Sequence, residues 1–110
     1  MRVTILYLAA GNSRRFGENK LLYSLDGKAV YRHLLERLAQ IAGRHENWEL
    51  LVVTQYERIL EELAPLVKAG RLQTVFSPDS EKGISYTIRA GIEAAEKQNA
   101  DACACFVADQ

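Results

Sequence analysis

The stretch Val3-Thr-Ile-Leu-Tyr-Leu8 runs directly into Ala9-Ala-Gly-Asn-Ser-Arg-Arg-Phe-Gly-Glu-Asn-Lys20, and this junction decides the fold. The first six residues form a short, mostly apolar run that predicts a buried strand. The residues that follow are rich in glycine and basic side chains. Gly11 and Gly17 permit tight turns and a close approach of the backbone to a ligand. Successive N–H groups of such a turn form a concave anion site, so the junction predicts a buried strand followed by a phosphate-binding loop.

Arg14, Arg15 and Lys20 would supply the positive charge that a triphosphate requires, because guanidinium forks and a lysine both bind phosphate oxygens. The loop does not follow either of two common phosphate-binding patterns. A Walker A loop requires Gly, four residues and then Gly-Lys-Ser/Thr, whereas five residues separate Gly11 from Gly17 here. The dinucleotide pattern Gly-x-Gly-x-x-Gly fails as well. The loop is therefore interpreted from its own residues.

The composition predicts a single small domain with no general affinity for nucleic acid. The chain has 110 residues, of which 48% are hydrophobic, enough for one core. Its 14 basic and 14 acidic residues give a net charge of zero, which argues against nucleic acid as a partner.

No signal peptide or membrane-spanning run is visible, so we expect a cytoplasmic protein with no membrane contact. We expect Cys103 and Cys105 to be small buried residues of a reduced protein.

Strands and helices alternate along the chain. Strands are expected at 3–8, 48–54, 72–76 and 102–108, and helices at about 30–42, from about 57, and at 84–98. This order predicts an open, mainly parallel α/β sheet with right-handed crossovers, in a three-layer Rossmann-like arrangement. Asp26-Gly27 predicts a tight turn. Gly43 is expected to cap the first helix, and Pro65 to end or kink the second.

Apolar stripes indicate which helix faces should meet the sheet. Ile41 belongs to the expected stripe of the first helix, Leu60 to that of the second, and Ile92 to that of the third. The loops at 9–20, at 77–87 and from 109 onward all follow strands. Ligands of open α/β sheets bind beyond the carboxyl ends of the strands, so the three loops are expected to form one site.

Two further groups of polar residues belong to this expected site. Ser85 and Thr87 open the third helix, where unpaired N–H groups and the helix dipole favour an anionic ligand. Their hydroxyls either bind a base or ribose or simply cap the helix. Asp109 follows the fourth strand, where a carboxylate can hold Mg²⁺ against substrate phosphates.

The phosphate loop resembles the signature of the MobA-like nucleotidyltransferases, Leu-Ala-Ala-Gly-x-Ser-x-Arg-x-Gly-x-x-Lys. The matching residues are Leu8, Ala9, Ala10, Gly11, Ser13, Arg15, Gly17 and Lys20. Gly83 to Gly91 resembles the family's second motif, with Thr87 in place of a serine, and Asp109-Gln110 resembles the start of its Asp-[Gln/Met]-Pro motif. Phe16 stands where the family usually has methionine, and Ser77 where it commonly has asparagine. Within the family the chain is most similar to the molybdenum cofactor (molybdopterin) cytidylyltransferases.

The resemblance implies a fold of the nucleotide-diphospho-sugar transferase type. Residues 1–110 would form the nucleotide-binding N-terminal part of a single domain, which we expect to be truncated after its fourth strand. The implied reaction is a Mg²⁺-dependent transfer of a nucleotidyl group to a phosphate-bearing acceptor, with release of pyrophosphate. Arg15 and Lys20 would act on the phosphates, and Asp109 would bind the metal. The nucleotide would be bound by Leu8, Ala9, Ala10, Gly11, Ser13, Arg14, Gly17, Ser85 and Thr87.

The resemblance also suggests substrates and partners. Ala-Ala-Gly in the loop favours CTP over GTP, and the implied acceptor is molybdopterin or a related pterin cofactor. A homo-oligomer or a molybdoenzyme partner is consistent with such a role. Two alternatives stay open. One is a transferase of the same fold that acts on a sugar phosphate or methylerythritol phosphate. The other is a non-catalytic module that binds a nucleotide or delivers a cofactor.

Overall fold

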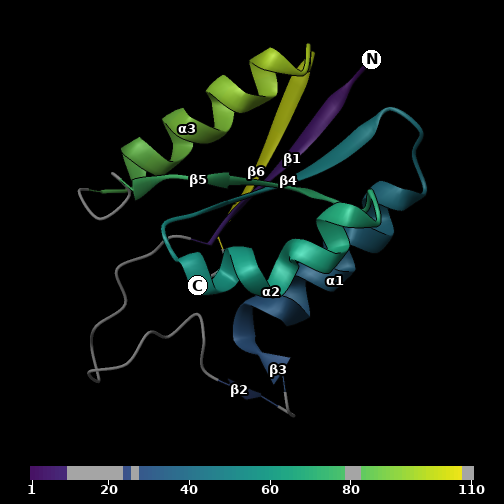
Figure 1. Ribbon diagram of the computed structural model, residues 1–110. Helices are drawn as coiled ribbons and strands as arrows, with labels where there is room; N and C mark the ends of the chain where they lie inside the picture. The colour runs from purple at the N-terminus through teal and green to yellow at the C-terminus, as the bar shows by residue number, and fades with distance from the viewer. Residues whose placement is uncertain (10–23, 26–27, 79–82, 108–110) are drawn as a thin grey trace.

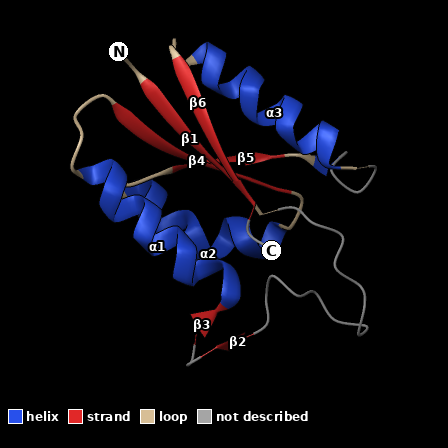
Figure 2. Ribbon diagram, turned by 180° about the vertical axis from the view of Figure 1, so that it is seen from behind, coloured by secondary structure: helices blue, strands red, loops and turns tan. Residues whose placement is uncertain are grey.

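A four-stranded parallel sheet lies between two helical layers (Figure 1). The computed structural model describes residues 1–9, 24–25, 28–78 and 83–107. The sheet has the order β5-β4-β1-β6 and consists of β1 (Val3–Leu8), β4 (Trp48–Thr54), β5 (Gln73–Phe76) and β6 (Ala102–Val107). Helices α1 (Val30–Gly43) and α2 (Glu57–Lys68) cover one face, and α3 (Ile84–Lys97) covers the other (Figure 2). The predicted three-layer α/β fold is confirmed.

Alternate side chains of the central strands β1 and β4 build two separate cores. Ile5 and Tyr7 pair in register with Leu50 and Val52, and all four pack against α1 and α2. Leu6, Leu8, Leu51 and Val53 point to the opposite face and pack against α3. Successive strand residues face opposite sides of a sheet, so a sheet covered on both faces needs apolar residues at every position. This requirement explains the continuous apolar runs in the sequence.

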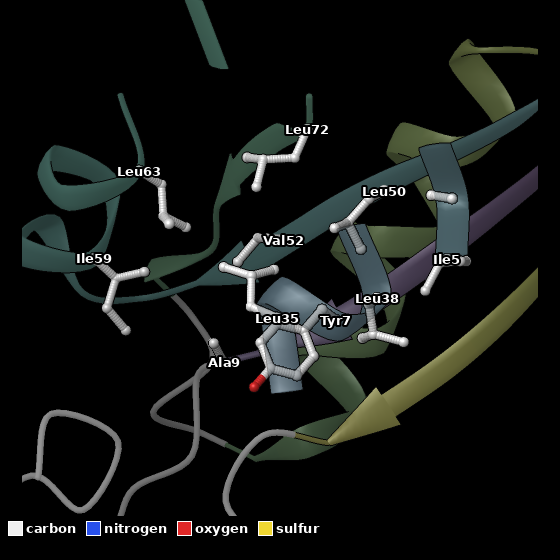
Figure 3. Packing of buried hydrophobic residues seen from close by; sticks show 11 residues of the cluster. Ile5, Tyr7, Ala9, Leu35, Leu38, Leu50, Val52, Ile59, Leu63 and Leu72 are labelled. Carbon is white, nitrogen blue, oxygen red and sulfur yellow. The ribbon is translucent and has the colours of Figure 1, made fainter. Parts of the chain in front are cut away.

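The larger core lies between the sheet and the helices α1 and α2 (Figure 3). Leu35 and Leu38 of α1 and Ile59 and Leu63 of α2 reach the strands from the same side. Leu72, which precedes β5, closes this core. The two helices are thereby packed against the same face of the sheet.

Strand β6 lies at the edge of the sheet and is the least covered strand of the part that the structure describes. Cys103 and Cys105 pair in register with Thr4 and Leu6 of β1, so they share the face that α3 covers. Helix α3 packs over β4, β1 and β5 instead of reaching over β6. Both cysteines are consequently exposed free thiols, and Phe106 is exposed too. The expectation that the cysteines are buried is wrong.

Gly43 does not cap α1 as expected, and Pro65 does not end α2. Gly43 is the last residue of α1 and does not have the positive φ of a left-handed helix cap. Pro65 lies inside α2, which continues to Lys68. A proline in a helix removes the hydrogen bond to the carbonyl four residues earlier. Here that carbonyl belongs to Glu61 on the exposed side of α2, where water can satisfy it.

The apolar stripes of the helices are narrower than predicted. Ile41 and Ile92 are exposed, and Leu60 is only partly buried. In α3 the residues that face the sheet are Ile88 and the small residues near it, including Gly91. A Cβ atom on Gly91 would lie 3.2 Å from Leu6 Cδ1 and 3.2 Å from Val53 Cγ2. Small residues therefore bring α3 close to the sheet and leave Ile92 at the margin of the contact.

A small hairpin connects the phosphate-loop region to α1. Strands β2 (Ser24–Leu25) and β3 (Lys28–Ala29) pair antiparallel, Ser24 with Ala29 and Leu25 with Lys28. They flank the predicted Asp26-Gly27 turn, whose own residues lie outside the described ones. Within the described ranges, no helix combines the length and apolar character needed to cross a membrane.

Candidate functional site

The carboxyl ends of the four sheet strands lie at one edge, because all of their pairings are parallel. The chain runs from β1 outward to β4 and β5, and then returns to the other side of β1 as β6. The strand order therefore reverses between β1 and β6, at the kind of switch point where open α/β sheets bind ligands. Leu8 pairs in register with both Val53 and Val107. The predicted phosphate loop and the segment with Asp109 thus leave the sheet from neighbouring strand ends.

The start of the phosphate loop is held by hydrogen bonds to β4. The Ala9 N–H donates to the Val53 carbonyl at 2.8 Å. The Thr54 hydroxyl donates to the Ala9 carbonyl at 2.7 Å, and it accepts a hydrogen bond from the Tyr56 N–H at 3.1 Å. Thr54 is fully buried. Both backbone groups of Ala9 are therefore bonded to β4 at the point where the loop begins.

The segment after β5 is anchored to the same strand. The Ser77 N–H donates to the Thr54 carbonyl at 2.8 Å, and Ser77 is buried. Helix α3 then starts from Gly83, whose φ of 143° is a conformation open essentially only to glycine. The N-cap residue Gly83 makes no side-chain cap hydrogen bond. Ser85 is exposed, whereas Thr87 is 3% exposed.

The structure places four of the predicted site residues. Leu8 and Ala9 lie at the carboxyl edge with buried side chains. Ser85 and Thr87 lie in the first two turns of α3, the helix that follows the β5 segment. The remaining predicted residues lie outside the described ones: Ala10, Gly11, Ser13, Arg14, Arg15, Gly17, Lys20 and Asp109.

The described part of this edge is built from backbone and hydroxyl groups. The Tyr7 phenol is buried near the end of β1, and burial raises its pKa, so it stays neutral. Arg89 lies 6.0 Å from the centroid of the Tyr86 ring on the exposed side of α3. Among the described residues there is no group of three or more His, Cys, Asp or Glu residues suited to a metal.

Sequence reasoning missed two residues that shape this edge. Thr54 is the last residue of β4 and follows four apolar residues, Leu50 to Val53, so its polar side chain at that position is the available signal. Gly91 was noted only as the end of the second motif. Its contacts show that it allows α3 to pack closely on β1 and β4 rather than touching a ligand.

The open parallel sheet with helices on both faces defines a Rossmann-like α/β domain. More particularly, the chain belongs to the family of MobA-like NTP transferase domains, which matches residues 5–110. Residues 1–4 alone lie outside this match.

Three relatives illustrate the range of the similarity. Purine catabolism protein PucB of Bacillus subtilis is 33% identical over 110 residues, which cover 96% of this chain and 52% of PucB. A probable molybdenum cofactor guanylyltransferase of Pyrococcus horikoshii is 35% identical over 71 residues, 57% of this chain and 37% of that protein. Bifunctional protein GlmU of a Mycobacterium species is 32% identical over 97 residues, 82% of this chain and 18% of GlmU. The chain thus spans about half the length of PucB and less of the other two.

Proposed function

We propose that this chain binds a nucleoside triphosphate at the carboxyl edge of its sheet and takes part in nucleotidyl transfer. The observation that carries the proposal is the position of the family's loop signature. It starts at Leu8 and Ala9, and the Ala9 backbone is bonded to β4 beside the switch point. Phosphates bound at such a position meet backbone N–H groups and the loop's cations together.

The proposed reaction needs no covalent attachment to the protein. A phosphate oxygen of the acceptor attacks the α-phosphorus of the triphosphate, a new P–O bond forms, and the bond to pyrophosphate breaks. Catalysis then depends on positioning and on neutralising the charge of the phosphates. We propose that Arg15 and Lys20 supply the positive charge that neutralises the phosphates, together with Arg14, which precedes Arg15 in the sequence. The backbone from Leu8 to Ser13, with Gly17, Ser85 and Thr87, is proposed to bind the nucleotide.

Asp109 is proposed to hold Mg²⁺ on the other side of the switch point. Its strand, β6, ends at Val107 in register with Leu8, so the two segments start as neighbours. Mg²⁺ favours one or two carboxylates together with phosphate and water oxygens. When bound, the ion would neutralise phosphate charge. The chain's own contribution would be one carboxylate, two residues after the end of β6.

The choice of base and acceptor rests on different kinds of support. The Ala9-Ala10-Gly11 sequence favours CTP. Relatives from Pyrococcus and Thermococcus, however, carry the name molybdenum cofactor guanylyltransferase, and this name suggests GTP. We propose CTP on the loop sequence and a molybdopterin-type acceptor on the family. The expected cytoplasmic location, homo-oligomer and molybdoenzyme partner stay predictions.

Calorimetric titration of the folded chain with CTP and with GTP, each with and without Mg²⁺, tests the proposal. We expect binding that is tighter with Mg²⁺ and tighter for CTP. Preference for GTP would move the base assignment to the one suggested by the named relatives. Absence of binding by folded protein would overturn the proposal. If the chain binds a nucleotide, a second assay measures pyrophosphate release in the presence of molybdopterin. Release would distinguish a transferase from a module that only binds a nucleotide.

A further inference from the structure

We propose that Thr54 is a positioning residue of the nucleotide site, acting through its hydroxyl on the start of the phosphate loop. This inference rests on the proposed function, since it gives Thr54 a role in nucleotide affinity. Thr54 would touch no substrate. Its side chain is fully buried beneath the carboxyl edge of the sheet.

The hydroxyl of Thr54 joins two segments that are far apart in the sequence. It donates to the Ala9 carbonyl at 2.7 Å, across 45 residues of chain, and accepts from the Tyr56 N–H at 3.1 Å. Tyr56 precedes α2, and its carbonyl accepts hydrogen bonds from the N–H groups of Ile59 and Leu60. One side chain therefore ties the residue before Ala10-Gly11 to the start of a helix that is packed into the core.

A threonine suits this position for two physical reasons. Its β-branched side chain favours the extended backbone of β4. Its hydroxyl is both donor and acceptor, so it can satisfy the Ala9 carbonyl and the Tyr56 N–H at once. Valine has nearly the same shape but would leave both backbone groups without this partner. A buried polar group that loses its partner costs more than the hydrogen bond itself was worth.

The consequence for a ligand follows from the position of Ala9. The residues directly after it carry the backbone N–H groups that we propose bind phosphate. If the Ala9 carbonyl is not held, only a fraction of molecules present these groups in the binding geometry. The apparent Kd rises in proportion as that fraction falls. Thr54 therefore acts on nucleotide affinity without lying in the site.

The experiment compares Thr54→Val with Thr54→Ser in the 110-residue chain. Nucleotide affinity is measured calorimetrically with MgCTP and MgGTP, at a temperature where urea unfolding shows each variant to be folded. We expect Thr54→Val to weaken binding about tenfold, equivalent to about 1.4 kcal/mol, and Thr54→Ser to restore most of the affinity. Thr4→Val is the matched control, because Thr4 is also buried but lies toward the amino end of β1. It should leave the Kd within about twofold, or about 0.4 kcal/mol.

A second readout does not depend on the nucleotide. Hydrogen exchange of the Tyr56 amide should accelerate in Thr54→Val and recover in Thr54→Ser. Wild-type affinity in Thr54→Val, or an equal loss in Thr4→Val, would overturn the role of Thr54 alone. If the wild-type chain binds neither nucleotide, the proposed function fails and this role fails with it, whatever the exchange of Tyr56 shows.

Discussion

Replacing Gly91 with alanine sets two opposing effects against each other in α3. Alanine is the better helix former, by about 1 kcal/mol in a helix interior. The new Cβ, however, would lie 3.2 Å from both Leu6 Cδ1 and Val53 Cγ2 and 3.3 Å from Leu6 Cδ2. These distances are shorter than ordinary van der Waals contact between carbon atoms.

The packing effect should be the larger one. Leu6 and Val53 are both fully buried and are themselves packed against neighbouring core residues, so neither can move aside freely. Inserting a methyl group into such a core costs about 1–3 kcal/mol. Taking about 2 kcal/mol for the packing cost and subtracting about 1 kcal/mol for helix propensity leaves a net loss of about 1 kcal/mol. In a domain of this size that loss lowers the Tm by about 4–8 °C.

The assay is urea and thermal unfolding followed by circular dichroism, with Gly43→Ala as the matched control. Gly43 is also helical, but a Cβ there would have nothing within 4 Å, so this change should be neutral or stabilising. A Gly91→Ala variant as stable as Gly43→Ala would refute the close-packing account of this glycine. Gly91→Val should cost more than Gly91→Ala, because its two γ-methyl groups would meet the same neighbours.

Three other changes have outcomes that follow from single features. Lys20→Ala should weaken MgCTP affinity about tenfold or more in calorimetry, since a hydrogen bond to a charged group contributes about 1.5–3 kcal/mol. The control Lys68→Ala should leave the affinity unchanged. Equal affinities of the two variants would remove the phosphate role of Lys20. Leu63→Ala should lower the free energy of unfolding by about 2–5 kcal/mol, because Leu63 is fully buried, and Leu60→Ala by clearly less. Native protein should be alkylated at both Cys103 and Cys105, as peptide mass spectrometry can show. Partial burial and the neighbouring Cys103 raise the pKa of the Cys105 thiol, so Cys105 labelling should be faster in Cys103→Ser. A Cys105 labelling rate unchanged by Cys103→Ser across alkaline pH would contradict this.

The strands were predictable because both faces of the sheet are covered. Val3–Leu8 and Trp48–Thr54 have the predicted bounds, since a strand buried on both faces is a nearly continuous apolar run. The helices were predictable in place but less so in orientation. A stripe of large apolar residues identified α3, yet Gly91 faces the sheet and Ile92 is exposed. The distance between a helix and the sheet depends on small residues such as Gly91. A pattern of large hydrophobic residues does not reveal which small residues face the sheet.

The position of β6 at the edge of the sheet was the other property that the local sequence pattern could not predict. Ala102–Val107 is as apolar as a central strand, but it pairs only with β1 among the described strands, so its cysteines are exposed. Whether a strand is central or at an edge depends on sheet order, which is a long-range property. The location of the candidate site was predictable, since it needs only strand polarity and connection order. The role of Thr54 was not, because it depends on a partner 45 residues away.

The pairing of β6 with β1 is also held at the end of the sheet opposite to the candidate site. At the start of β6 the Arg2 N–H donates to the Asp101 carboxylate at 2.8 Å, and the Asp101 N–H donates to the Arg2 carbonyl at 2.7 Å. These bonds set the register in which Val107 meets Leu8. A slip of one residue would turn every β6 side chain to the other face. The reciprocal bonds between Arg2 and Asp101, about 20 Å from the carboxyl edge, therefore help to hold Val107, two residues before Asp109, beside Leu8.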